Sequence, residues 1–222
     1  MINTSIGDAC IEWGDEKFCF HPSFFSMQRL GEPKDIEDCA ELALSGYYRA
    51  RDLGVMTRSE FWTCLHILGC CETNEREISE EIYGYYDENG VFHAGREPVV
   101  NLGVIAWHLV NIGINGEPSE RMKKLAKIRK KDTEREPFNP IEYVASAVAH
   151  LGMNQSDAWQ LTMIEFQRAM ESKFPPSQED QKRLDSMMTP EESKALIKRI
   201  ADAKRNMKGN KQTVRFNGKR VK

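Results

Sequence analysis

The sequence predicts a mostly α-helical fold made of two small helical units, with short β-hairpins in the N-terminal unit. Three observations support this fold class. Several amphipathic segments begin with capping boxes, in which Ser or Thr is followed three residues later by Glu. Residues 98–113 are apolar on nearly every face, which is typical of a central core helix. Apolar alternation around polar turns indicates hairpins at residues 8–20 and 82–95, although the second could also be an exposed aromatic loop.

The N-terminal unit is expected to cover residues 1–116 and to bury the apolar helix 98–113. Between the two hairpins the spacing of apolar residues predicts helices, and Gly or Pro marks their ends. The expected helices are residues 22–30, residues 33–44 with Gly46 closing the helix, and a helix opened by the capping box of Thr57 and Glu60.

A change in composition divides the chain after this unit. Seven of the eleven residues from 121 to 131 are basic, which is typical of a solvated helix or linker. The expected organisation is a basic charged linker at 117–136, a C-terminal helical unit at 137–176, polar helices at 177–207 and a basic flexible tail at 208–222.

The C-terminal unit contains three helix signals in succession. Asn139 can cap the first helix, with Pro140 at its first position. Asn154 or Ser156 opens a brief second turn. The expected inward face of the first helix consists of Ile141, Val144, Ala145 and Val148, and the third helix follows the capping box of Thr162 and Glu165.

No motif predicts catalysis or a cofactor. The sequence lacks a Gly-rich nucleophile elbow and a phosphate-binding Gly loop, so we expect a chain that is not an enzyme and holds no cofactor. The group Cys64, His66, Cys70 and Cys71 lacks the paired spacing of structural zinc sites, which favours buried core thiols and leaves metal binding as an open alternative. All six cysteines are expected to be reduced.

Bulk properties exclude some other classes. The net charge of −3 gives no overall attraction to nucleic acid or membrane. The first residues show neither the basic start nor the apolar stretch of a secretory signal, and no apolar run reaches membrane-spanning length. We therefore expect a cytoplasmic chain without membrane contact.

Methionine and aromatic residues gather in the C-terminal half. Methionine is common on adaptable binding surfaces because its unbranched thioether repacks against varied partners. Burial inside the chain's own helical hairpin is the alternative for these side chains. The candidate partner-binding residues are Met153, Trp159, Leu161, Phe166 and Met170.

The order of an apolar helix, an LGM sequence, an acidic turn, W-x-L-T and then E-F resembles the small tail assembly chaperones of tailed phages. Residues 18–36 resemble the opening of another tail-assembly family, and most of the chain resembles an uncharacterised family of phage proteins. The residues that carry the first resemblance are Leu151, Gly152, Trp159, Leu161, Thr162, Glu165 and Phe166.

The resemblance implies a chaperone that binds the tape measure protein, a long helical chain, in the host cytoplasm. It would keep that protein soluble until the tail tube protein polymerises, and would be absent from the mature virion. The tail tube protein and a second copy of the chain are further candidate partners. The alternatives are a structural tail-completion or connector protein of the virion and, less favoured, a nucleic-acid-binding phage protein that uses the basic run 121–131 and the tail.

Overall fold

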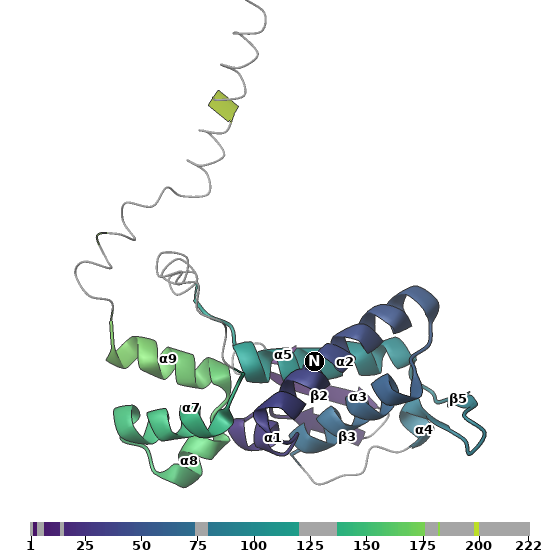
Figure 1. The fold of residues 1–222 in the computed structure, drawn as a ribbon, viewed down its shortest axis with the longest axis horizontal. Coiled ribbons are helices and arrows are strands. Elements are labelled where there is room, and N and C mark those ends of the chain that lie inside the picture. The colour runs from purple at the N-terminus through teal and green to yellow at the C-terminus, as the bar shows by residue number, and fades with distance from the viewer. Residues whose placement is uncertain are drawn as a thin grey trace, which may run out of the picture. The chain divides into compact units, whose positions relative to one another are not determined.

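The computed structural model describes residues 2–3, 7–13, 16–73, 80–119, 137–175, 182, 198 and 199. Residues Met1–Pro175 form one compact unit (Figure 1), and Pro176–Lys222 are assigned to a separate unit. The linker expected at 117–136 lies outside the described residues except for its first three. The tail expected at 208–222 also lies outside the described residues. Of the helices expected at 177–207, only Lys182, Lys198 and Arg199 are described, and all three are helical.

The fold is mostly α, as predicted, with two small antiparallel sheets. The first sheet has the order β1-β2-β3, with β1 at Ile2–Asn3, β2 at Asp8–Trp13 and β3 at Glu16–Phe20. Strands β2 and β3 confirm the hairpin predicted at residues 8–20. Its alternating side chains place Ala9, Phe18 and Phe20 in the core.

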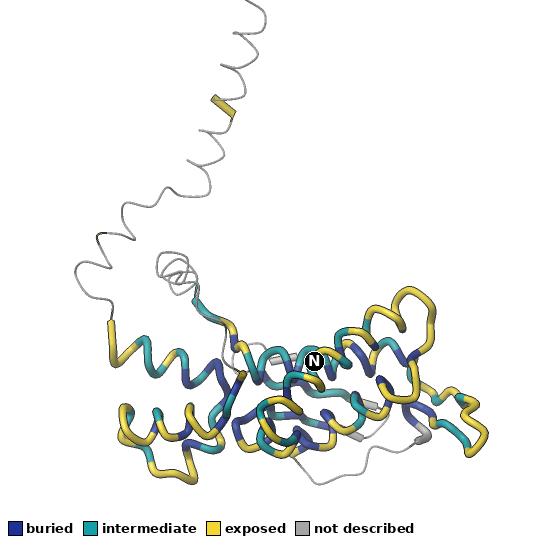
Figure 2. Tube along the Cα trace, viewed as in Figure 1, coloured by how far each residue is buried: buried dark blue, intermediate teal, exposed yellow. Residues whose placement is uncertain are grey.

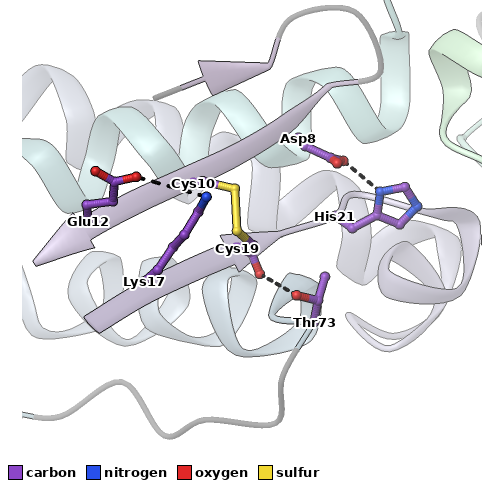
Figure 3. The surroundings of a disulfide bond; sticks show 7 residues. All are labelled: Asp8, Cys10, Glu12, Lys17, Cys19, His21 and Thr73. Atoms are coloured by element: carbon purple, nitrogen blue, oxygen red, sulfur yellow. Dashed lines mark hydrogen bonds and ion pairs between the residues drawn. A yellow bond between two sulfur atoms is a disulfide. The ribbon is translucent and has the colours of Figure 1, made fainter. Parts of the chain in front are cut away.

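The opposite face of this hairpin corrects the prediction that all cysteines are reduced. Cys10 and Cys19 are direct cross-strand partners with Cα atoms 4.2 Å apart, and they form a disulfide (Figure 3). Their register places both side chains on the same face of the hairpin, opposite each other. Sequence spacing alone did not reveal the pair, because its identification requires the strand register.

Three helices form the centre of the unit: α2 at Pro33–Leu53, α3 at Arg58–Cys71 and α5 at Val99–Asn115. Each packs against the other two. The predicted Thr57–Glu60 capping box is present at the start of α3, and the predicted core helix is present as α5. Their shared core includes Ile36, Phe61 and Leu102, which are fully buried.

The predicted end of α2 at Gly46 is wrong. The helix continues for two more turns to Leu53 and ends at Gly54, whose φ is +72°. Gly46 instead provides a close approach between helices, because a Cβ there would lie 3.1 Å from the Cβ of Glu60 on α3. From the sequence alone, a glycine that ends a helix cannot be distinguished from a glycine that allows two helices to pack closely.

The second predicted hairpin is also present, in a shorter form. It follows α4 at Glu80–Tyr83 and consists of β4 at Gly84–Tyr86 and β5 at Phe92–Ala94. The rings of Tyr86 and Phe92 meet the buried ring of Phe61 edge to face, at centroid distances of 5.5 and 5.4 Å. This contact attaches the hairpin to α3.

The C-terminal part of the compact unit contains α7 at Pro140–Ser146, a π-helical turn η1 at Ala147–Leu151, α8 at Gln155–Gln160 and α9 at Met163–Lys173. All three predicted start signals are present: Asn139 and Asn154 accept hydrogen bonds as caps, and Thr162 forms a capping box with Glu165. These helices lie beside α1, at Phe24–Gln28 (Figure 1).

Backbone contacts join α1 to the C-terminal helices. Ser23 and Thr162, which cap α1 and α9, form an antiparallel bridge, and the N–H of Phe24 donates to the carbonyl of Leu161. Residues 137–175 are thus built onto the N-terminal elements. None of the described helices combines the length and apolarity needed to cross a membrane.

Candidate partner-binding surface

An aromatic cluster anchors the C-terminal helices to α1. The ring of Phe24 stacks on Tyr143 at 5.6 Å and meets Phe166 edge to face at 5.8 Å, while Phe138 stacks on the other side of this group, 5.3 Å from Tyr143. Phe24, Phe138 and Phe166 are all buried. The cluster therefore determines which faces of α7 and α9 point inward.

The position of Phe166 corrects its prediction as a surface contact. Its side chain is 7% exposed and lies between Phe24 and Tyr143, so it is part of the core. The alternative considered from the sequence was burial within its own helical hairpin; the residue is buried, but against Phe24 of α1 as well as against Tyr143 of α7.

The other four candidate residues lie at an intermediate depth. Met153, Trp159, Leu161 and Met170 are half-buried and pack against the core with one side. They come from α8, α9 and the segments that flank α8. A partner could reach only their outer edges, so they are weaker candidates for a docking surface than fully exposed side chains.

A different set of apolar residues is exposed, on α7 and η1. Ile141 is 54% exposed and Val148 is 39% exposed, and Ala145 between them is exposed as well. Figure 2 colours several residues of the α7–η1 segment as exposed. We call these three residues the α7 stripe.

The α7 stripe corrects the predicted inward face of this helix, of which only Val144 is buried. The stacking of Tyr143 between Phe24 and Phe138 turns Val144 inward, and Ala147 follows it. The three stripe residues therefore point outward. The hydrophobic spacing indicated an amphipathic helix correctly, but it could not show which of two adjacent apolar faces would meet α1.

A hollow of about 400 Å³ lies beside the N-terminal end of α7. Its walls come from the first half of α2, the end of α5 and the start of α7. Three carboxylates line it, those of Glu37, Glu41 and Glu142, above the apolar surface of Phe138 and Ile114. No Lys or Arg is present among the described residues that line it, so its charge is negative. We call it the acidic hollow.

The acidic hollow and the α7 stripe are neighbours. Glu142 follows Ile141 in the chain, and successive residues of an α-helix are about 100° apart around its axis. One edge of the apolar stripe is therefore bordered by a carboxylate of the hollow. The side chain of Glu142 is held in place by a hydrogen bond of 3.2 Å from the amide of the cap residue Asn139.

A second group of exposed apolar side chains surrounds the turn between α2 and α3. Its members come from the end of α2, the turn and the first turn of α3. The guanidinium of Arg51 lies 4.7 Å from the ring centre of Tyr48 and covers part of this group. The group consists of Tyr48, Leu53, Val55 and Trp62.

A buried carboxylate, Glu60, joins α2 to α3 under this second group. It accepts hydrogen bonds from Ser45 at 2.7 Å, from Arg49 at 2.9 Å and from the N–H of Thr57 at 2.8 Å. Burial acts to raise the pKa of Glu60, but these donors outweigh it and lower the pKa to about 2. These contacts make Glu60 an ionised link between α2 and α3.

The environment of the α3 cysteines favours the protonated thiol. Burial raises the pKa of Cys64 to about 12 and raises the pKa of Cys71 further, which disfavours the reactive thiolate. The sulfur of Cys70 lies 3.8 Å from Nε2 of the exposed His66. Within the described ranges, no three His, Cys, Asp or Glu side chains come together in a way that could hold a metal ion.

Comparison with known proteins gives one result. Residues 45–194 match the model of a family described as "Family of unknown function (DUF6246)". The matched residues include both exposed apolar groups and the helices α7 to α9. No curated protein and no solved structure matches the chain significantly.

Proposed function

The chain belongs to the family of unknown function DUF6246, and from its own surfaces we propose that it is a non-catalytic tail assembly chaperone of a tailed phage, which binds the tape measure protein. The observation that carries this proposal is the α7 stripe. Exposed apolar residues at helical spacing are suited to cover the apolar face of another helix. The resemblance of residues 151–166 to tail assembly chaperones supports the identity of the partner.

The physical mechanism is the reversible cover of apolar helix faces. A tape measure protein exposes long apolar stretches before the tail tube encloses it. Contact with the α7 stripe removes part of this surface from water, and the half-buried edges of Trp159 and Met170 extend the contact area. Several copies along one chain act together through their high local concentration.

The proposed place of action is the cytoplasm of the infected bacterium, whose reducing conditions favour the dithiol form of Cys10 and Cys19. As the tail tube protein assembles on the tape measure protein, it competes for the same apolar faces. The chaperone is then released, so the mature virion does not contain it.

Co-expression tests this proposal. The chain is produced together with the tape measure protein of the same phage, and the soluble fraction and co-purification of the two are measured. We expect a soluble complex with this chain and aggregated tape measure protein without it. Equal solubility in both cases, or the absence of co-purification, would contradict the proposal.

Matched variants locate the contact. Ile141→Ser with Val148→Ser removes the apolar character of the stripe, and Val91→Ser with Val104→Ser changes residues of 55% and 39% exposure elsewhere. We expect only the first pair to reduce co-purification. Mass spectrometry of purified virions then separates the rival role, because stoichiometric copies in the particle would favour a tail-completion or connector protein.

A further inference from the structure

The α7 stripe and the acidic hollow adjoin at Ile141 and Glu142 and differ in chemical character. The stripe is apolar and exposed, whereas the hollow beside it is lined by the carboxylates of Glu37, Glu41 and Glu142. A purely apolar partner would bury these carboxylates without compensation, which is unfavourable. The surface therefore selects among apolar helices by their charge.

The two carboxylates on α2 are available to an incoming cation. Within the described part of the chain, neither Glu37 nor Glu41 makes a hydrogen bond or an ion pair. The lysine nearest in sequence on the same helix, Lys34, is paired with Asp38 at 2.7 Å and interacts more weakly, by charge alone, with Glu37 and Glu41. Glu37 and Glu41 are one helical turn apart, and like charges at this spacing repel each other, so a basic group between them is favoured.

We propose that the occupant of this surface is an amphipathic helix whose apolar stripe is flanked on one side by lysine or arginine. Its apolar side chains cover the α7 stripe and its basic side chains enter the acidic hollow. Two basic residues one turn apart on the partner match the one-turn spacing of Glu37 and Glu41. This inference rests on the proposed function and defines which segments of the tape measure protein are bound.

Two peptides of opposite charge test the chemistry. Both are fluorescein-labelled amphipathic helices of about 18 residues, or five turns, with leucine on one face; the rest is lysine in one peptide and glutamate in the other. Binding to the full chain is measured by fluorescence anisotropy. We expect the Leu/Lys peptide to bind at least about 10-fold more tightly than the Leu/Glu peptide, because its charge is complementary to the hollow.

Two pairs of charge variants assign the effect to the hollow. Glu37→Gln with Glu41→Gln is expected to weaken Leu/Lys binding about 5-fold, as for two partly exposed ion pairs. The control pair, Glu12→Gln with Glu88→Gln, removes the same net charge at exposed positions elsewhere and should change binding less than about 2-fold. Equal binding of both peptides, or equal effects of the two variant pairs, would overturn the inference.

The outcome also separates this inference from the proposed function. Suppose that the Ile141 and Val148 variants reduce co-purification of the tape measure protein but peptide charge has no effect on binding. The inferred preference for a basic partner helix is then wrong, whereas the chaperone role is supported. If the peptides discriminate by charge through Glu37 and Glu41 but no tape measure protein co-purifies, the surface chemistry is supported and the chaperone role fails.

Discussion

The imidazole of His21 lies 2.6 Å from the carboxylate of Asp8, and its other nitrogen lies 2.9 Å from the backbone carbonyl of Gln160. Both partners are acceptors, so the protonated imidazole can donate from Nε2 to the carbonyl and from Nδ1 to the carboxylate (Figure 3). In this form the ring is positively charged and links β2 to the end of α8. Burial acts to lower the pKa of His21, but the carbonyl of Gln160 and the carboxylate of Asp8 outweigh it, and the pKa is raised.

A raised pKa makes this link dependent on pH in a definite direction. Its stabilisation is complete below the ordinary histidine pKa of 6.5 and is lost as the pH rises through the folded pKa. Asp8→Asn should lower the free energy of unfolding by about 1 kcal/mol at pH 6 and by less at pH 9. Urea unfolding at the two pH values measures this difference, and a gap that widens at pH 9 would contradict it.

Glu60 has the opposite pH dependence. Because its folded pKa is lowered to about 2, its contribution to stability is complete above about pH 4.5 and is lost as the pH falls toward 2. Glu60→Gln should lower the free energy of unfolding by about 2 kcal/mol at pH 7, since it weakens several buried hydrogen bonds at once. The difference from the parent protein should shrink in acid titrations of stability, and a constant difference would exclude the ionised network.

Replacing single side chains by alanine distinguishes core residues from surface residues in the C-terminal helices. Phe166→Ala should lower the free energy of unfolding by about 3–5 kcal/mol, because it leaves a cavity between Phe24 and Tyr143. Ile141→Ala should change it by less than about 0.5 kcal/mol, because its side chain is exposed. Thermal unfolding followed by circular dichroism measures both, and equal losses would show that the α7 stripe is buried.

Two helical glycines should respond oppositely to the same substitution. A Cβ added to Gly103 on α5 would lie 2.9 Å from the Cα of Tyr47 on α2, so Gly103→Ala should destabilise the protein by about 1–3 kcal/mol through overpacking. A Cβ at Gly69 on α3 meets nothing within 4 Å among the described residues. Gly69→Ala should therefore stabilise by about 0.5–1 kcal/mol through helix propensity. Chemical denaturation of the pair tests this contrast.

The Cys10–Cys19 disulfide closes a short loop. Bridged residues nine apart in sequence should contribute about 2–3 kcal/mol by the loop-entropy estimate. Dithiothreitol should shift the urea midpoint of the parent protein downward, whereas a variant with Cys10→Ser and Cys19→Ser should unfold at the same midpoint with and without the reductant. If dithiothreitol also shifts the urea midpoint of that variant, the effect arises from a sulfur other than those of Cys10 and Cys19.

Local signals in the sequence predicted most of the elements. The caps at Thr57, Asn139 and Thr162 each depend on a residue and its neighbour three positions later or less, so they are visible in the sequence itself. The hairpins and the core helix α5 follow from local patterns in the same way. Elements whose sequence signals lie within one helical turn or one hairpin could therefore be predicted.

Features that depend on contacts between distant elements could not be predicted. The role of Gly46 depends on α3, the burial of Phe166 depends on α1, and the outward direction of Ile141 depends on the stacking of Tyr143. The acidic hollow needs α2, α5 and α7 together, so the sequence pattern of any single element gives no sign of it. The candidate surface was consequently expected on and around α8 and α9, whereas the α7 stripe lies on α7 and η1.

The hydrogen bond between His21 and Gln160 joins residues 139 positions apart, and it has a consequence for the order of folding. Closing so long a loop is entropically costly, and the cost is recovered only when many contacts form at once. During synthesis the N-terminal elements leave the ribosome first, so they can collapse before α7 to α9 exist. The proposed docking surface is thus completed only after α7 has formed, and we expect that a nascent chain truncated before α7 does not capture a helix.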